Sequence, residues 1–175
     1  MSDEKTGIQC FLRLHMAGGQ IQKTYRVEPE TWERLEILLD EPLRKKDGYD
    51  FFSFDTLDGR SVSISLPDIQ MVNYVSGNHD PEKDEANFSG IRLYFRHTLL
   101  PASIMLADDI EAFFLESVVS STTRDEPFFS FLDRNGERCS FNLDHLLIME
   151  LSTQQVCQGR LAEMAAEDPA PSANG

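Results

Sequence analysis

The chain has 175 residues, of which 41% are hydrophobic and 26% charged, a composition typical of a globular protein. Its formal net charge is −14, from 30 acidic and 16 basic residues, and this excess argues against a protein that neutralises a phosphate backbone. Length and charge together therefore favour one domain with a full core, or two small lobes that share one, and disfavour nucleic acid as the partner.

The N-terminal elements are predicted to be two strands and a helix. The strands are Ile8–Met16 and Gln20–Val27, joined by a tight turn at Ala17-Gly18-Gly19, where glycine permits positive φ angles. The helix is expected to begin at Pro29, and it has an apolar face at helical spacing, formed by Trp32, Leu35, Leu38 and Leu39. Three strands should follow it, at Tyr49–Leu57, Ser61–Leu66 and Ile69–Val75, with a turn at Asp58-Gly59.

The remainder of the chain repeats this order. The tetrapeptide Phe-Phe-Ser-Phe occurs at Phe51–Phe54 and again at Phe128–Phe131, and a polar turn with glycine follows each copy. In the second copy Asp108 is the expected N-cap of a helix, with Glu111 completing a capping box. The strands expected there are Ile91–His97, Ala102–Leu106, Phe128–Asp133, Glu137–Leu143 and His145–Leu151, with a turn at Asn135-Gly136.

The repeat predicts an α+β fold built from an internally duplicated β-β-α-β-β-β unit. We expect two small antiparallel sheets or half-barrels, each with one helix, packed about a pseudo-two-fold. In each copy two adjacent phenylalanines point to opposite faces of a strand, so both faces should be covered. The expected organisation is a flexible N-terminus (1–7), a first unit (8–76), an acidic linker (77–89), a second unit (90–153) and a disordered tail (154–175).

The candidate ligand-binding residues lie near the expected ends of the first strand of each unit. His15 and His97 hold similar places there, and imidazoles brought together would titrate between about pH 5 and 8. Three arginines, Arg13, Arg92 and Arg96, could contact the same ligand. The alternative is that strand ends are wet and tolerate histidine.

Small uncharged residues occupy the outward positions of two predicted strands, namely Ser61, Ser63 and Ser65 in one unit and Ser140 and Asn142 in the other. Solvent-facing strands more often carry charged residues, so these rows suggest close approach by another surface, between units or between subunits. An ordinary wet polar face explains them equally well.

The remaining reactive groups indicate no catalytic or metal site. Cys139 is expected to be a buried inert thiol, and the acids near the two polar turns fit turn chemistry better than a metal site. Three cysteines without metal-ligand spacing favour a reducing compartment, and no apolar stretch is long enough for a membrane span. We therefore expect a cytoplasmic protein without cofactor, metal or membrane contact.

Read from the first helix, the helix followed by five strands (Glu28–Leu39, then strands through Leu106) resembles the element order of Sm-like small barrels. That resemblance implies subunit rings and RNA binding, an alternative that the acidic charge disfavours. The favoured hypothesis is a non-catalytic binding, regulatory or assembly module that acts through a homo-oligomer or a protein partner. A second hypothesis is a small-ligand or nucleotide sensor with its site at the junction of the two units.

Overall fold

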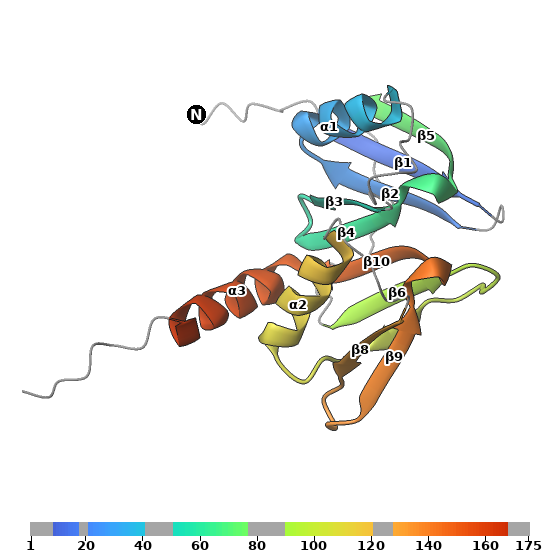
Figure 1. The fold of residues 1–175 in the computed structure, drawn as a ribbon. Coiled ribbons are helices and arrows are strands. Elements are labelled where there is room, and N and C mark those ends of the chain that lie inside the picture. The colour runs from blue at the N-terminus through green and yellow to red at the C-terminus, as the bar shows by residue number, and fades with distance from the viewer. Residues whose placement is uncertain (1–8, 18–20, 41–50, 77–89, 121–127, 168–175) are drawn as a thin grey trace, which may run out of the picture.

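The computed structural model describes residues 9–17, 21–40, 51–76, 90–120 and 128–167. Its first half contains β1 (Cys10–Met16), β2 (Gln22–Val27), α1 (Pro29–Asp40), β3 (Phe51–Asp55), β4 (Arg60–Ser65), the 3-10 turn η1 (Leu66–Asp68) and β5 (Ile69–Ser76). Its second half contains β6 (Ile91–Phe95), β7 (Ala102–Ile104), α2 (Asp109–Ser120), β8 (Phe128–Leu132), β9 (Arg138–Asn142), the 3-10 turn η2 (Leu143–His145) and β10 (Leu146–Ser152), and α3 (Thr153–Glu167) follows. The fold is α+β, with small sheet units and packed helices (Figure 1).

The two halves have the same order of elements and equivalent internal strand pairings. In the first half β1 pairs with β2 and β5, and β3 pairs with β4. In the second half β6 pairs with β7 and β10, and β8 pairs with β9. The last strand of each half begins directly after a 3-10 turn. Its second residue has no partner in the neighbouring strand: Gln70 of β5 is skipped in the pairing with β1, and Leu147 of β10 in the pairing with β6. Residues at the same place in the two halves can therefore be compared directly.

One strand pairing joins the halves. β10 lies between β4 of the first half and β6 of its own half, in a sheet of order β3-β4-β10-β6-β7. The equivalent pairing, of β9 with β5, does not occur among the described strands. There β5 is an edge of the sheet β2-β1-β5, and β8 is the one described strand with which β9 pairs. Of the two equivalent strand pairs, β4 with β10 and β9 with β5, the first therefore joins the halves and the second is not formed among the described strands.

Apolar clusters lie on both faces of β3. Phe52 and Phe54 belong to a cluster with Tyr25 and Ile64 of the first half, whereas Phe51 belongs to a cluster formed mainly by the second half, including Leu115 of α2. Burying a side chain of this size contributes roughly 1.5–3 kcal/mol. The expectation that both faces of the strand are covered is confirmed for β3 and is wrong for β8, where Phe128 is 61% exposed.

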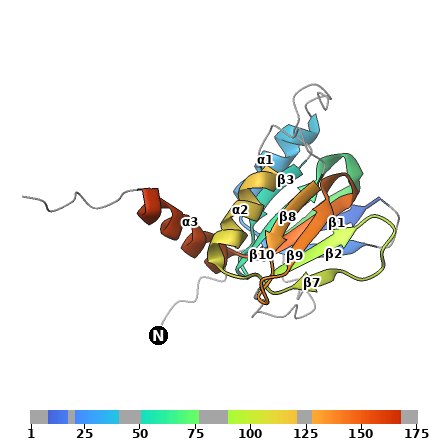
Figure 2. The ribbon, with the colours of Figure 1, turned by 60° about the horizontal axis from the view of Figure 1, so that its bottom comes forward.

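The helix of the second half begins as its sequence predicts. Asp108 caps α2, because its Oδ1 accepts a hydrogen bond of 3.0 Å from the backbone N–H of Glu111. Figures 1 and 2 both place α2 between α1 and α3. Helix α2 packs against β3 and β4 of the first half as well as against β8 and β10 of its own half. It therefore covers the β4–β10 pairing, which is the joint between the halves.

The segment predicted as a disordered tail contains α3, so the prediction of disorder is wrong for residues 154–167. Val156 belongs to the core cluster of the second half, and Gly159 is buried against α2. A Cβ built on Gly159 would lie 1.9 Å from the carbonyl oxygen of Asp109, so glycine permits the close approach of α2 and α3. Beyond this contact α3 projects away from the sheets (Figure 1).

The two predicted glycine turns are confirmed. Gly59 and Gly136 have φ angles of 86° and 77°, which favour glycine, and both turns have the same backbone hydrogen bonds. The other predicted turn, at Ala17-Gly18-Gly19, extends beyond the described residues. The flexible N-terminus (1–7), the acidic linker (77–89) and the tail from residue 168 also lie outside them.

Candidate functional site at the junction of the halves

A buried carboxylate lies at the centre of the joint. Glu150 of β10 is 0% exposed, and its two oxygens accept hydrogen bonds from Tyr25 of the first half, at 2.7 Å, and Tyr94 of the second half, at 3.3 Å. Its oxygens also lie 3.5 Å from Nη1 of Arg60 and 3.8 Å from Nη1 of Arg92. Because a buried charge is costly unless it is paired and hydrogen-bonded, these four contacts explain how the carboxylate is accommodated.

Burial and the charge of Glu150 shift the pKa values of the side chains around it. Burial and the negative charge of Glu150 raise the pKa of Tyr25 well above its usual value. Burial alone would lower the pKa of Arg60, but its hydrogen bond with Asp58 and the charge of Glu150 outweigh that effect and raise it. The arginine therefore stays charged, linking the Asp58 turn of one half to β10 of the other.

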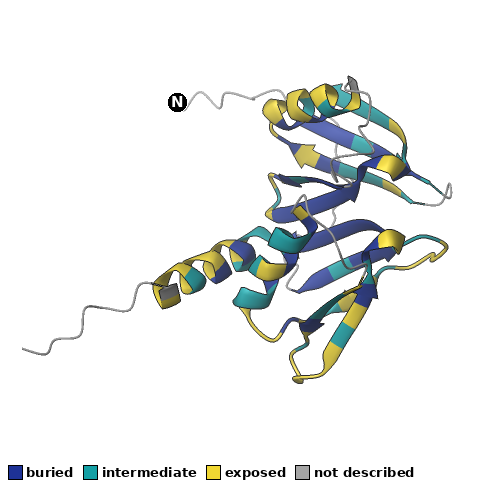
Figure 3. Ribbon diagram, viewed as in Figure 1, coloured by how far each residue is buried: buried dark blue, intermediate teal, exposed yellow. Residues whose placement is uncertain are grey.

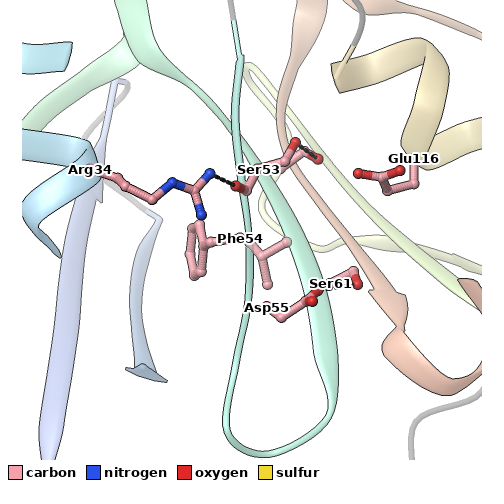
Figure 4. A pocket seen from close by; sticks show the side chains of 8 residues that line it. Arg34, Ser53, Phe54, Asp55, Ser61 and Glu116 are labelled. Atoms are coloured by element: carbon pink, nitrogen blue, oxygen red, sulfur yellow. Dashed lines mark hydrogen bonds between the residues drawn. The ribbon is translucent and has the colours of Figure 1, made fainter. Parts of the chain in front are cut away.

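Serine hydroxyls connect β3 and β4 with the end of α2. The Oγ of Ser53 lies 2.7 Å from the Oγ of Ser63 and 2.9 Å from the Oγ of Ser120 at the end of α2. Ser120 in turn donates to Glu116 at 2.9 Å, and Arg34 of α1 donates to the carbonyl oxygen of Ser53 at 3.3 Å. Figure 4 shows Arg34 and Glu116 reaching this position from opposite sides. Side chains from both halves thus meet on the outer face of β3 and β4.

A small pocket of about 140 Å³ lies at this contact. Ser61, which lines it, donates a hydrogen bond of 2.5 Å to Asp55 and a longer one of 3.4 Å to Thr153 of α3. Glu116 and Arg34 also line it. The lining therefore offers hydroxyl, carboxylate and guanidinium groups that are engaged with one another, which is the arrangement of a polar contact between two packed surfaces.

The equivalent outer face in the second half is open to solvent. Phe51 of β3 is 8% exposed, whereas Phe128, at the same place in β8, is 61% exposed. Ser63 is buried, whereas Ser140, its counterpart in β9, is exposed. The hydrogen bond between the strands is the same, because the Oγ atoms of Ser130 and Ser140 lie 2.6 Å apart. Figure 3 shows β4 as buried throughout, β10 as buried up to its last residue, and part of β9 as exposed.

The five predicted ligand-binding residues are spread over the fold. His15 lies in β1 opposite Met71, and His97 lies exposed in the turn after β6 with a φ of 65°. By strand pairing the counterpart of His15 is Tyr94, not His97, because the two face the equivalent residues Met71 and Ile148. The prediction that the two histidines hold matching places is therefore wrong.

The three predicted arginines have different surroundings. Arg13 lies in β1 opposite Asn73. Arg92 lies in β6 opposite Glu150 and belongs to the buried cluster. Arg96 follows β6, and its Nη2 contacts Asp68 of the first half at 2.7 Å. The structure thus brings Arg92 and Arg96 to the joint.

The predicted serine rows divide between buried and open positions. Ser61, Ser63 and Ser65 of β4 are buried, whereas Ser140 is exposed and Asn142 half-buried. Asn142 accepts a hydrogen bond from the backbone N–H of Asp144, and so it caps η2.

Cys139, predicted to be buried and inert, is half-buried on β9. Burial and the charges of Asp133 and Glu137 raise the pKa of its thiol. In the described part of the chain no group of three histidine, cysteine, aspartate or glutamate side chains could hold a metal ion. No helix among the described residues is long and apolar enough to cross a membrane.

The central residues of the joint were not predicted from the sequence. The sequence does contain a sign that Glu150 is structurally important: it is an acid inside the apolar run Leu146–Leu151, and a charge in a buried strand requires partners. The sequence contains no such sign for Arg60, because an arginine directly after an Asp58-Gly59 turn is common in a solvent-exposed loop.

Comparisons with protein-family models, curated proteins and solved structures give no significant match to this chain.

Proposed function

We propose that this protein is a non-catalytic assembly module that acts through a homo-oligomer. One observation carries the proposal: β4 and β10 are buried and pair with each other, whereas the equivalent strands β9 and β5 each have an edge that no other described strand pairs with. Open edges with apolar side chains are sites at which another chain can add. The exposed side chains along these two strands and the adjoining β8 include Met71, Phe128 and Leu132.

The proposal predicts a solution mass above that of one chain. Light scattering at increasing protein concentration measures this mass. Each chain carries a formal charge of −14, so repulsion should weaken association at low ionic strength, and the series should run from low to physiological salt. A single-chain mass throughout would contradict the proposal.

A pair of variants tests whether the open edges are responsible. Ser140→Lys places a charge on β9, and we expect it to reduce the assembled fraction at least tenfold. Ser103→Lys places the same charge on β7, an edge strand whose counterpart β2 is also an edge. This control should leave the mass unchanged, and an equal effect of both variants would argue against the edges.

A second candidate function is binding of a small anionic ligand. A pocket of about 340 Å³ opens where β2 approaches β6, and it is lined by Lys23, Arg92 and Tyr94 among others. Two cationic side chains at one pocket favour a carboxylate or phosphate group. A thermal-shift screen of nucleotides and dicarboxylates tests this function. It predicts stabilisation that Lys23→Met abolishes, and no shift at millimolar ligand would rule it out.

A further inference from the structure

The joint inside one chain shows how a second copy would pair with it. Met149 lies opposite Ser63 in the β4–β10 ladder, and Glu150 lies opposite Val62. The counterparts of Met149 and Glu150 of β10 are Val72 and Asn73 of β5. The counterparts of Ser63 and Val62 of β4 are Ser140 and Cys139 of β9. The same ladder built from the open edges would set Val72 opposite Ser140 and Asn73 opposite Cys139.

The geometry points to a head-to-tail assembly in which β9 of one copy pairs antiparallel with β5 of the next, Asn73 opposite Cys139. This inference rests on the proposed homo-oligomer and specifies its interface. The two edges belong to different halves, so the contact joins unlike surfaces. After one contact, the first copy still has its β5 edge free and the second its β9 edge, so repetition forms a ring or a filament.

Helix α1 of the incoming copy would cover the open outer face of β8 and β9, as α2 covers β3 and β4. Val119 of α2 is 1% exposed and shares a core cluster with Phe51, whereas Leu39, at the equivalent place in α1, is 37% exposed. Phe128, the counterpart of Phe51, is also exposed. Contact between Leu39 and Phe128 across the interface would bury both side chains.

Charge supports the same arrangement. Glu116 of α2 lines the pocket beside Ser61 of β4. The residue of α1 that corresponds to Glu116 is Glu36, and the residue of β9 that corresponds to Ser61 is Arg138. Both Glu36 and Arg138 are exposed. Docking would bring the Glu36 carboxylate to the Arg138 guanidinium, a pairing of opposite charges between surfaces that would otherwise repel.

Cysteine cross-linking tests the register, with Cys157→Ser as the background because Cys157 is exposed. We expect Asn73→Cys to form reducible multimers through Cys139 on mild oxidation at alkaline pH, in at least half of the protein. Cross-strand neighbours on one face are about 4.5–5.5 Å apart between Cβ atoms, so a short bifunctional thiol reagent is used in parallel. Asn73→Cys combined with Cys139→Ser should give no such product.

A matched variant controls for accidental contact. Val72→Cys changes the neighbouring position, whose side chain points to the other face of β5, and it should cross-link at least tenfold less than Asn73→Cys. Stronger cross-linking of Val72→Cys would overturn the register. Oligomers by light scattering without cross-linking of Asn73→Cys would overturn this interface and leave the proposed function standing. A single-chain mass for the unaltered protein would overturn both.

A charge exchange gives a second measurement that does not depend on cysteine chemistry. Arg138→Glu should shift the association midpoint to at least tenfold higher protein concentration. Glu36→Lys in the same chain should restore most of the loss, because the ion pair is reversed rather than removed. Additive weakening by the two substitutions would contradict contact between these residues.

Discussion

The carboxylate of Glu150 in β10 lies 3.5 Å from Nη1 of Arg60 in β4, so a buried ion pair spans the two strands that join the halves. The counterparts of these residues at the open edges are Asn73 in β5 and Glu137 in β9. The open edges cannot form the same ion pair. The charge pattern therefore distinguishes the joint within one chain from any pairing between copies, and it would favour folding of each chain on itself before assembly.

Removing the buried charge should destabilise the joint. We expect Glu150→Gln to lower the free energy of unfolding by about 3 kcal/mol, because breaking a buried ion pair leaves its partner charge uncompensated. Chemical denaturation measures this loss. Glu28→Gln, at an exposed position, is the control and should change stability by less than about 0.5 kcal/mol. Equal losses in the two variants would show that the cluster contributes little.

The Asp58 carboxylate should make stability depend on pH in the acidic range. Burial alone would raise its pKa, but hydrogen bonds from Arg60 and Thr56 lower it below the usual value of 3.8. A lowered pKa in the folded state stabilises the fold above the unfolded-state pKa, and this contribution is lost as the pH falls through the folded value.

Asp58→Asn therefore should flatten the acid side of the stability profile. The measurement is the free energy of unfolding at several pH values from about 6 down to about 3. The variant should be less stable than the unaltered protein at the upper end, and the difference should shrink as the pH falls. A constant difference over the whole range would contradict the role of this carboxylate.

Much of the fold could be predicted from the sequence because local signals agree with the repeat. The glycine turns at Gly59 and Gly136, the cap at Asp108 and the alternation of apolar residues each act over a few residues. The repeated Phe-Phe-Ser-Phe segment then relates one half to the other. These signals do not say which strand edges pair between the halves, since β4 and β9 have equivalent places in the repeat.

The joint depends on contacts between residues far apart in the chain, and these were not predictable. Tyr25, Arg60 and Glu150 come together only because β10 pairs with β4. The exposure of Phe128 was likewise hidden, because its segment is identical to that of buried Phe51. Helix α3 was missed because the residues from Gln158 onward lack the apolar spacing of a docked helix, whereas the structure makes the contact with α2 through Gly159, which has no side chain.

The close contact of α3 with α2 gives a prediction in which two effects oppose each other. Gly159→Ala should favour the helix by about 1 kcal/mol, but its Cβ would meet the carbonyl oxygen of Asp109 at 1.9 Å. Overpacking costs about 1–3 kcal/mol, so we expect a net loss of about 1 kcal/mol in denaturation experiments. Gln158→Ala, at the adjacent exposed position, should be nearly neutral. Stabilisation by Gly159→Ala would contradict the packing of these helices.

The two equivalent phenylalanines should respond differently to the same substitution. Phe51→Ala removes a buried ring and should cost about 3 kcal/mol of unfolding free energy at low protein concentration. Phe128→Ala removes an exposed ring and should cost less than about 0.5 kcal/mol under the same conditions. At high concentration Phe128→Ala should instead reduce the mass measured by light scattering, because the assembly buries this side chain. Unchanged mass in Phe128→Ala would show that the outer face of β8 takes no part in association.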